Sequence, residues 1–388
     1  MSLRSCERRF ERYLDGLAEV MGHADRVGPL RDYCTGLMLP CARKSVEPMA
    51  AATAPGRTSA QHQSLLHFVG QGAWSDELVL EKVRAMVLVE IERHGPIEAW
   101  IIDDTAFPKK GRHSVGVGRQ YCGQLGKQEN CQAAVSLSIA NHHASLPVRY
   151  QLYLPQSWAG DGARRRKAGV PAHIAFKTKP EIALEQIRWA VENGLPPGAV
   201  LSDVGYGNNS LLRTEISALN LPYVAGVRSD TTVWPPGAKL QTRQKTNKRG
   251  QTRVSRRGQN TPISVKDVAL ALPKRAWRTI GWREGSNERL SSRFARVRVR
   301  AAHDDVLRDE EWLLIEWPKT SRSRRSTGYQ RCHSTSPSSA WSTWPSCAGA
   351  SSAIIRSSSR NSALATSRAV VGAASIITQR SASQLTVT

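Results

Sequence analysis

The last part of this chain contains no acidic side chain. Glu316 is the last acidic residue and Lys319 the last Lys, whereas residues 320–388 hold nineteen Ser and eight Arg. At ordinary composition, so long a stretch without Asp or Glu arises by chance about once in a thousand. A segment so rich in Ser and so poor in regular apolar spacing is not expected to fold. We therefore expect the folded part of the chain to lie within residues 1–319.

The whole chain has the composition of a strongly basic globular protein. Its 388 residues carry a net charge of +23, of which the eight Arg of the tail supply +8 and leave +15 for the rest. This charge favours a polyanionic partner, most simply nucleic acid. There is no apolar run that could cross a membrane or act as a signal peptide, so we expect a cytoplasmic protein. The seven Cys include no C-x-x-C pair, which favours free thiols over disulfides or a zinc site.

Apolar spacing predicts a helical part followed by a mixed part. Residues 1–93 have helical periodicity, with Ser75 as a predicted N-cap, and form either a DNA-binding domain or a plain structural bundle. Residues 94–228 read as three strands, a helix, a strand, a helix and a strand, which is a mixed α/β sheet. Residues 229–319 are basic and return to strand-like alternation. Residues 320–388 are the tail, which we expect to be disordered.

The elements of the mixed part can be placed along the chain. Strands are expected at 97–104, 131–140, 147–154, 199–203 and 221–227, and helices at 179–194 and 209–220. Alternation of apolar and polar residues, or a short apolar run, predicts the strands, and amphipathic spacing predicts the helices. In the basic part, further strands are expected between residues 278 and 317.

Two apolar strands of the mixed part lead to carboxylates. In IIDDTAFPKKG, apolar residues end at Asp103 and Asp104, and a turn follows. In VLSDVGYG, Asp203 follows a short apolar strand and precedes a loop with two Gly. Ligand sites of α/β sheets gather beyond the carboxyl ends of strands, and carboxylates suit Mg²⁺ or Mn²⁺. The alternative is that Asp203 caps a helix and that Asp103 or Asp104 closes a turn; for both sites together in so basic a chain, we favour metal binding.

Basic residues near these acids are candidates for contact with DNA phosphates. Lys109 and Lys110 lie in the predicted turn, and Arg119 lies in a Gly-rich stretch that lacks the third Gly of a nucleotide-binding loop. A second group lies in residues 240–258, which hold many Lys and Arg and no acid; its candidates are Arg243, Lys245, Lys248 and Arg249. For both groups the alternative is a solvated turn or loop.

These segments together resemble a known family. IIDDTAFPKKG, HSVGVGRQYCGQLGKQENCQAAVSLSIA, LPVRYQLYLP and VLSDVGYG are similar to the transposases of bacterial insertion sequences, in the branch of the DDE superfamily marked by a Y-R-E-K signature. The resemblance covers roughly residues 60–319. It implies a ribonuclease H-like catalytic fold with a β-rich insertion. It also implies metal-dependent cutting and joining of double-stranded DNA at element ends, by a homodimer in the bacterial cytoplasm and nucleoid.

The resemblance also assigns residues to the chemistry. The family's first acid matches Asp104, with Asp103 as a near alternative, and its second acid matches Asp203. These residues are then catalytic, and Asp104 and Asp203 bind the metal. The family uses a site for two Mg²⁺ or Mn²⁺ ions, which can activate the attacking oxygen and stabilise the leaving oxygen of a phosphodiester.

The third acid of the family, a Glu on a late helix, has no counterpart in the tail. The codons of CAGASSAII (residues 347–355), read one base earlier, permit L-R-W-R-I-E-R-D-Y, which contains the family's R-W-R-I-E signature. The same frame permits Y-W-L-S-T-L-P from Thr327 onward and a Lys seven places after the Glu. We infer a change of reading frame between about Pro318 and Ser326. This change also explains the missing acids, whose codons are read out of frame.

The loss of the third acid leaves three functional hypotheses. The first is a DDE transposase by descent that is catalytically inactive as this polypeptide, because a three-carboxylate site without one ligand loses most of its activity. The second is a non-catalytic DNA-binding remnant that represses the full-length transposase. The third is programmed frameshifting, in which this product and a full-length one are both made.

Overall fold

The computed structural model describes residues 3–41, 43–235, 242–246, 252–256, 261–284, 289–302, 308–317 and 329–333. These residues fall into two compact units, one within Met1–Pro197 and the other within Gly198–Ser358. The domain boundaries predicted after residues 93, 228 and 319 divide the chain differently and stay predictions. Within the described ranges, no helix is both long and apolar enough to span a bilayer.

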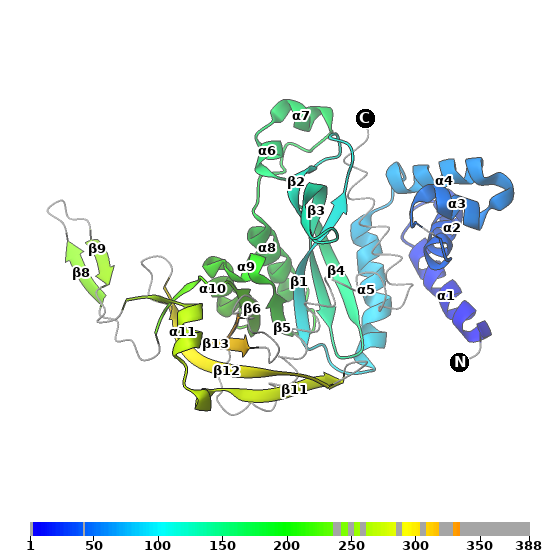
Figure 1. The fold of residues 1–388 in the computed structure, drawn as a ribbon. Coiled ribbons are helices and arrows are strands. Elements are labelled where there is room, and N and C mark those ends of the chain that lie inside the picture. Colours follow the sequence, from blue (N-terminus) through cyan, green and yellow to red (C-terminus); the bar gives the residue numbers. More distant parts are fainter. Residues whose placement is uncertain are drawn as a thin grey trace. The chain divides into compact units, whose positions relative to one another are not determined.

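The N-terminal part is helical, as predicted (Figure 1). Its elements are α1 (Leu3–Ala18), η1 (Ala24–Arg26), α2 (Val27–Met38), α3 (Val46–Thr53), η2 (Pro55–Arg57), α4 (Thr58–Gly70) and α5 (Asp76–Glu92), where η marks a 3₁₀ helix. α5 begins where predicted, because the Ser75 hydroxyl accepts a hydrogen bond from the N–H of Leu78 at 3.3 Å. Acidic residues in its first turn complement the helix dipole.

The first unit also contains an antiparallel sheet built on one long strand. The strands are β1 (Ala99–Pro108), β2 (Gly118–Cys122), β3 (Lys127–Ala140) and β4 (Ser145–Leu152), and three helices follow, α6 (Gln156–Ala159), α7 (Gly162–Lys167) and α8 (Lys179–Glu192). β1, β2 and β4 each pair with β3. α8 starts at a capping box formed by Thr178 and Glu181. It packs on the sheet, where the buried Gln186 amide donates to the Val135 carbonyl at 3.0 Å.

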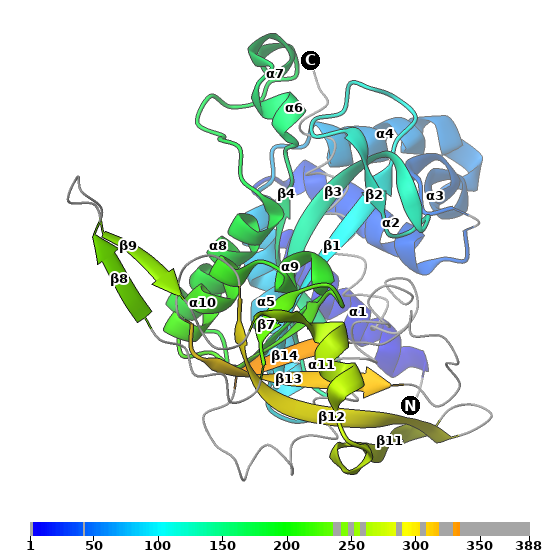
Figure 2. The same ribbon diagram turned by 60° about the vertical axis from the view of Figure 1, so that its left-hand side comes forward.

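The second unit begins with a parallel strand pair. β5 (Ala199–Ser202) and β6 (Tyr223–Val227) are parallel and are joined through α9 (Val204–Gly207) and α10 (Ser210–Ala218). Within this unit the strand order is β10–β7–β12–β13–β14–β6–β5, with β11 beside β12. The remaining elements are β7 (Thr232–Trp234), β10 (Ile263–Ser264), α11 (Val265–Ala271), η3 (Lys274–Ala276), β11 (Arg278–Glu284), β12 (Arg289–Ala301), β13 (Glu310–Trp317) and β14 (Tyr329–His333). β8 (Thr242–Thr246) and β9 (Thr252–Arg256) form a two-stranded sheet of their own (Figure 2).

The fold class agrees with the prediction, and two elements depart from it. The described part is a mixed α/β structure with a helical N-terminal part and a β-rich insertion, compatible with a ribonuclease H-like fold. One departure is β2, which falls in the Gly-rich stretch 116–126. The other is β14, which lies in the tail that we expected not to fold. β14 pairs with β13 on one side and β6 on the other, so strand ladders on both sides hold this short segment. The rest of the tail lies outside the described residues.

Candidate active site

The first two candidate acids lie inside a strand. β1 continues past Asp104 to Pro108, so the expectation that the strand ends at the two carboxylates is wrong, and so is the turn given as the alternative. The physical reason is the length of β3. Its ladder with β1 runs from Ala99↔Ala140 to Pro108↔Cys131, so residues 105–107 have paired partners too.

The β1–β3 ladder fixes the backbone around both acids. Asp103 lies opposite Ser136 and Asp104 lies opposite Val135. The Ser136 hydroxyl donates to the Asp103 carbonyl at 3.2 Å. The Asp103 carboxylate in turn accepts the N–H of Asp104 at 2.8 Å. Both side chains are half-buried on a paired central part of the strand, which gives them a well-defined position.

A lysine from α8 meets Asp104. Lys179, the first residue of that helix, donates a hydrogen bond through Nζ to Oδ2 of Asp104. The side chains are 26% and 31% exposed, so water and a small ion can reach the pair. The same ammonium lies 5.5 Å from the centre of the Tyr153 ring. A divalent cation at Asp104 would therefore compete with a cation that the protein itself supplies.

The second candidate acid is the N-cap of a short helix. Asp203 follows β5 directly, and its Oδ1 accepts the N–H groups of Gly205 at 2.8 Å and Tyr206 at 3.3 Å. The capping geometry is the alternative that the sequence left open. It does not exclude metal binding, because a carboxylate has lone pairs on both oxygens and can accept a backbone N–H while binding a cation.

A contact between two glycines seats the α9 turn on β6. A Cβ atom at Gly207 would lie 1.9 Å from the carbonyl oxygen of Gly226, and one at Gly226 would lie 2.8 Å from the backbone N of Val204. Such distances leave no room for a side chain at either position. The N–H of Gly207 also donates to the backbone carbonyl of Asp203 at 2.8 Å. The backbone that carries Asp203 is thus held directly against a buried strand.

A buried arginine fixes the same turn from the other side. Arg213 of α10 is 3% exposed and donates to the carbonyl of Gly207. Its Nε lies 3.6 Å from Oε1 of Glu311, which accepts the Tyr223 hydroxyl at 2.6 Å. Arg213 therefore joins α9, β6 and β13 into one polar network around the Asp203 turn. Sequence reasoning missed this residue because it sits within an ordinary amphipathic helix pattern.

The donor chemistry of the two acids fits a hard divalent cation, but the described part of the chain shows no complete metal-binding group. Carboxylate oxygens are the ligands that Mg²⁺ and Mn²⁺ prefer. The ammonium of Lys179 already pairs with the Asp104 carboxylate that would bind the metal ion. Among the described residues, no three His, Cys, Asp or Glu side chains are grouped so that they could hold a metal ion. Asp104 belongs to the first unit and Asp203 to the second.

The structure describes some, but not all, of the basic residues predicted to contact DNA. Asn130 braces the turn at Lys109, where it accepts the N–H of Lys109 through its backbone carbonyl at 2.9 Å and donates through its side chain to the Lys109 carbonyl at 2.6 Å. Burial lowers the pKa of Lys109. Lys110 and Arg119 are exposed. Arg243 and Lys245 fall on β8, whereas Lys248 and Arg249 lie outside the described residues.

Comparisons with known proteins agree with the resemblance seen in the sequence. A family model described as "DDE superfamily endonuclease" matches residues 16–289. Over 169 residues the chain is 31% identical to a protein of Microchaete diplosiphon named as a probable transposase for insertion sequence element IS701. This alignment covers 43% of the present chain and 41% of the relative, so the chain matches about two fifths of the relative's length.

Proposed function

Because the chain belongs to the DDE superfamily of endonucleases, we propose that it is a transposase polypeptide of a bacterial insertion sequence. The family match over residues 16–289 carries this proposal. The likeness to a probable transposase supports it, as does a net charge of +23, which suits double-stranded DNA as the partner. The reaction of the intact enzyme is metal-dependent strand cleavage and transfer at the ends of the element, by a homodimer in the cytoplasm and nucleoid. Residues 1–93, 94–228 and 229–319 serve as its helical domain, catalytic core and insertion.

Asp104 and Asp203 are the proposed metal ligands, with Asp103 as the alternative to Asp104. A bound pair of Mg²⁺ or Mn²⁺ ions would activate an attacking oxygen and stabilise a leaving oxygen on a DNA phosphodiester. The protein holds Asp104 on the β1–β3 ladder, and it holds Asp203 by capping and by the Gly207 contact. Lys179 pairs with Asp104, and a divalent cation that binds Asp104 would displace the Lys179 ammonium from the carboxylate.

This polypeptide does not cleave DNA in our proposal, because its third carboxylate is missing. No Asp or Glu follows Glu316, so no residue of the tail can replace the family's Glu. The alternate frame through residues 347–355 permits the signature that contains that Glu. A change of reading frame near residues 318–326 therefore separates this chain from an active enzyme.

The second candidate function is DNA binding without cleavage. It is favoured by the charge of the chain outside the tail, +15 once the eight tail Arg are removed from +23. A product that binds element ends but does not cut them would occupy the sites of the full-length enzyme and repress it. Programmed frameshifting would supply both products from one gene.

The test compares this chain with a version whose gene is returned to the alternate frame after residue 318. Both are incubated with Mg²⁺ and a DNA fragment that carries the element's own end. We expect cleavage by the restored chain alone. Asp104→Asn and Asp203→Asn should each abolish it, although Asn still caps a helix. The matched control is Asp161→Asn, which changes the equivalent N-cap of α7 and should cleave normally. If the restored chain with Asp203→Asn cleaves as fast as the restored chain without it, Asp203 is not a metal ligand.

A further inference from the structure

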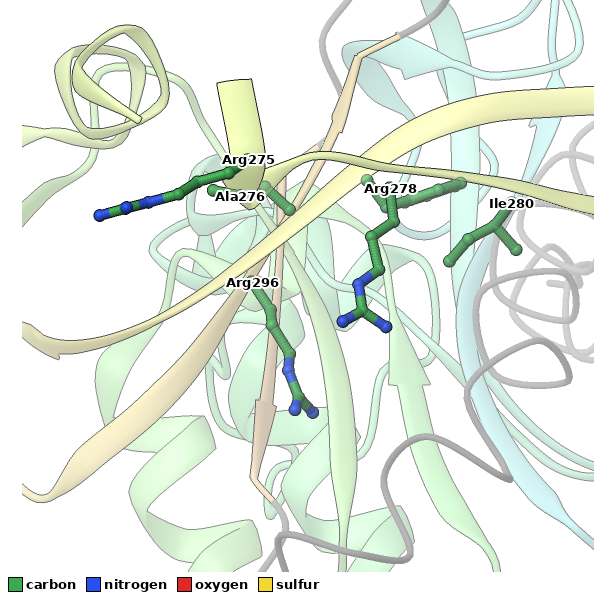
Figure 3. A pocket seen from close by; sticks show the side chains of 7 residues that line it. Arg275, Ala276, Arg278, Ile280 and Arg296 are labelled. Carbon is green, nitrogen blue, oxygen red and sulfur yellow. The ribbon is translucent and has the colours of Figure 1, made fainter. Parts of the chain in front are cut away.

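A pocket in the β-rich insertion lies among arginines that have no role in the proposed chemistry. Its volume is about 210 Å³, and its lining residues come from η3, β11 and β12; they are Arg275, Ala276, Arg278, Ile280, Phe294, Ala295 and Arg296 (Figure 3). A water molecule takes up about 30 Å³ in the liquid, so the pocket can hold a phosphate group. The pocket lies entirely within the second unit.

Strand pairing places two of these arginines on one face of the sheet. Arg278 of β11 lies opposite Phe294 of β12, and Arg296 follows Phe294 by two residues, on the same face. Figure 3 shows the Arg278 and Arg296 side chains extending in the same direction from neighbouring strands, while Arg275 points away at the rim. Ile280 and Phe294 form an apolar wall beside them.

The two guanidinium groups are close enough to affect each other. Burial and, to a smaller extent, the charge of Arg278 lower the pKa of Arg296. Arg296 also lies over the ring of Trp312 of β13 at 4.7 Å, and this stacking holds its guanidinium in place. Like charges held this near to each other are stabilised when an anion binds between them.

The surrounding face carries more positive than negative charge. Its arginines on β11 and β12 are Arg278, Arg296, Arg298 and Arg300, and its acids on β13 are Glu310 and Glu316. Glu310 pairs with Arg298 at 3.4 Å and with Arg300 at 3.5 Å. Glu316, opposite Phe294, is buried. Among the side chains of this face that the structure describes on β11, β12 and β13, four arginines against two carboxylates leave a positive charge before Arg275 is counted.

We propose that Arg278 and Arg296 form a binding site for a backbone phosphate of DNA. Guanidinium groups present planar pairs of donors that match phosphate oxygens. Apart from Arg275, which points away from the pair, the other lining side chains are apolar and have no donors or acceptors to read a base edge. The contact therefore positions the duplex without specifying its sequence. This inference rests on the proposed function, because it takes DNA as the source of the phosphate.

The experiment measures binding of the full chain to a fluorescent duplex by anisotropy over a series of salt concentrations. The variants are Arg278→Ala, Arg296→Ala and the matched control Arg293→Ala, which is on the opposite face of β12. Each pocket variant should weaken binding about tenfold and lower the salt slope by about one, equally for an element end and an unrelated duplex. The control should bind like the parent. Circular dichroism verifies that each variant is folded. Arg278 is exposed, so Arg278→Ala should fold and still tests the proposal if Arg296→Ala misfolds.

Other results would overturn the inference in distinguishable ways. Unchanged affinity of a folded Arg278→Ala chain contradicts it directly. A loss confined to the element end would mean base recognition instead of phosphate binding. Calorimetric binding of inorganic phosphate that needs Arg278, with no effect of the variant on DNA affinity, would identify a site for a free anion. A parent chain that binds no duplex at all would contradict the proposed function itself.

Discussion

A Cβ atom at Gly207 would lie 1.9 Å from the carbonyl oxygen of Gly226. This close approach joins the C-terminal end of α9 to β6 at Gly226, next to the strand's last residue. Because Asp203 begins the same turn and accepts its N–H groups, the glycine contact determines where the proposed metal ligand can lie. Gly207 is therefore expected to matter for the position of Asp203 although it carries no side chain.

Gly207→Ala should destabilise the second unit by about 1–3 kcal/mol or more, because the methyl group overlaps a backbone atom that cannot move aside. Urea unfolding followed by circular dichroism measures the change. Gly70→Ala is the control, since a Cβ at this helical position meets no atom within 4 Å. It should be neutral or slightly stabilising. Equal stability of the two variants would mean that the α9 turn is not seated as described.

Lys179→Ala should strengthen binding of divalent cations. It removes the ammonium that pairs with Asp104, and an ion pair of this exposure is worth up to about 1 kcal/mol, or about fivefold in affinity. Titration with Mn²⁺ followed by electron paramagnetic resonance measures the effect without any DNA cleavage. Lys177→Ala, which breaks a pair with Glu185 at 2.7 Å, should leave Mn²⁺ affinity unchanged. Weaker binding by Lys179→Ala would contradict the competition.

The Arg213–Glu311 pair should be costly to break from either side. Its side chains are 4% and 14% exposed, and removal of one member of a buried pair costs about 3–5 kcal/mol. We expect Arg213→Met and Glu311→Gln to destabilise the unit strongly. The double variant should cost less than the sum of the two single changes. Additive costs in this double-mutant cycle would mean that the two side chains do not interact.

Thiol reactivity should separate the cysteines of the folded chain. Burial raises the pKa of the Cys34 thiol to about 12 and that of Cys131 to about 11, so both stay protonated near pH 8 and react slowly. Cys6 is exposed and should be alkylated quickly. Mass spectrometry of labelled peptides measures each rate, and unfolding in urea should make the three alike. Fast labelling of Cys34 in the folded chain would contradict its burial.

Local signals in the sequence were enough for many elements. The amphipathic spacing of residues 179–194 predicted α8, and the apolar run before Asp203 predicted β5. Ser75, a residue type favoured at the N-cap, predicted the start of α5. These elements are determined by residues near each other in the chain, so propensity and capping are informative.

Contacts between distant residues could not be predicted in this way. Nothing near Asp104 in the sequence points to Lys179, which reaches it only because α8 packs on the sheet. The length of β1 depends on its partner strand rather than on its own residues. β2 was missed because its Gly-rich stretch looks like a loop. Gly126, with φ of 65°, lies just before β3 and allows the tight turn that follows β2.

We propose that this chain is a transposase of the DDE superfamily that lost its third carboxylate through a change of reading frame. The most direct measurement is the nucleotide sequence of the gene from the Trp317 codon to beyond the Thr388 codon. We predict that the frame one base earlier encodes R-W-R-I-E-R-D-Y across residues 348–355, with the family's Lys seven codons after the Glu. If that frame encodes another sequence or contains stop codons there, a change of reading frame does not explain the missing acid, and the Ser-rich segment is part of the encoded protein.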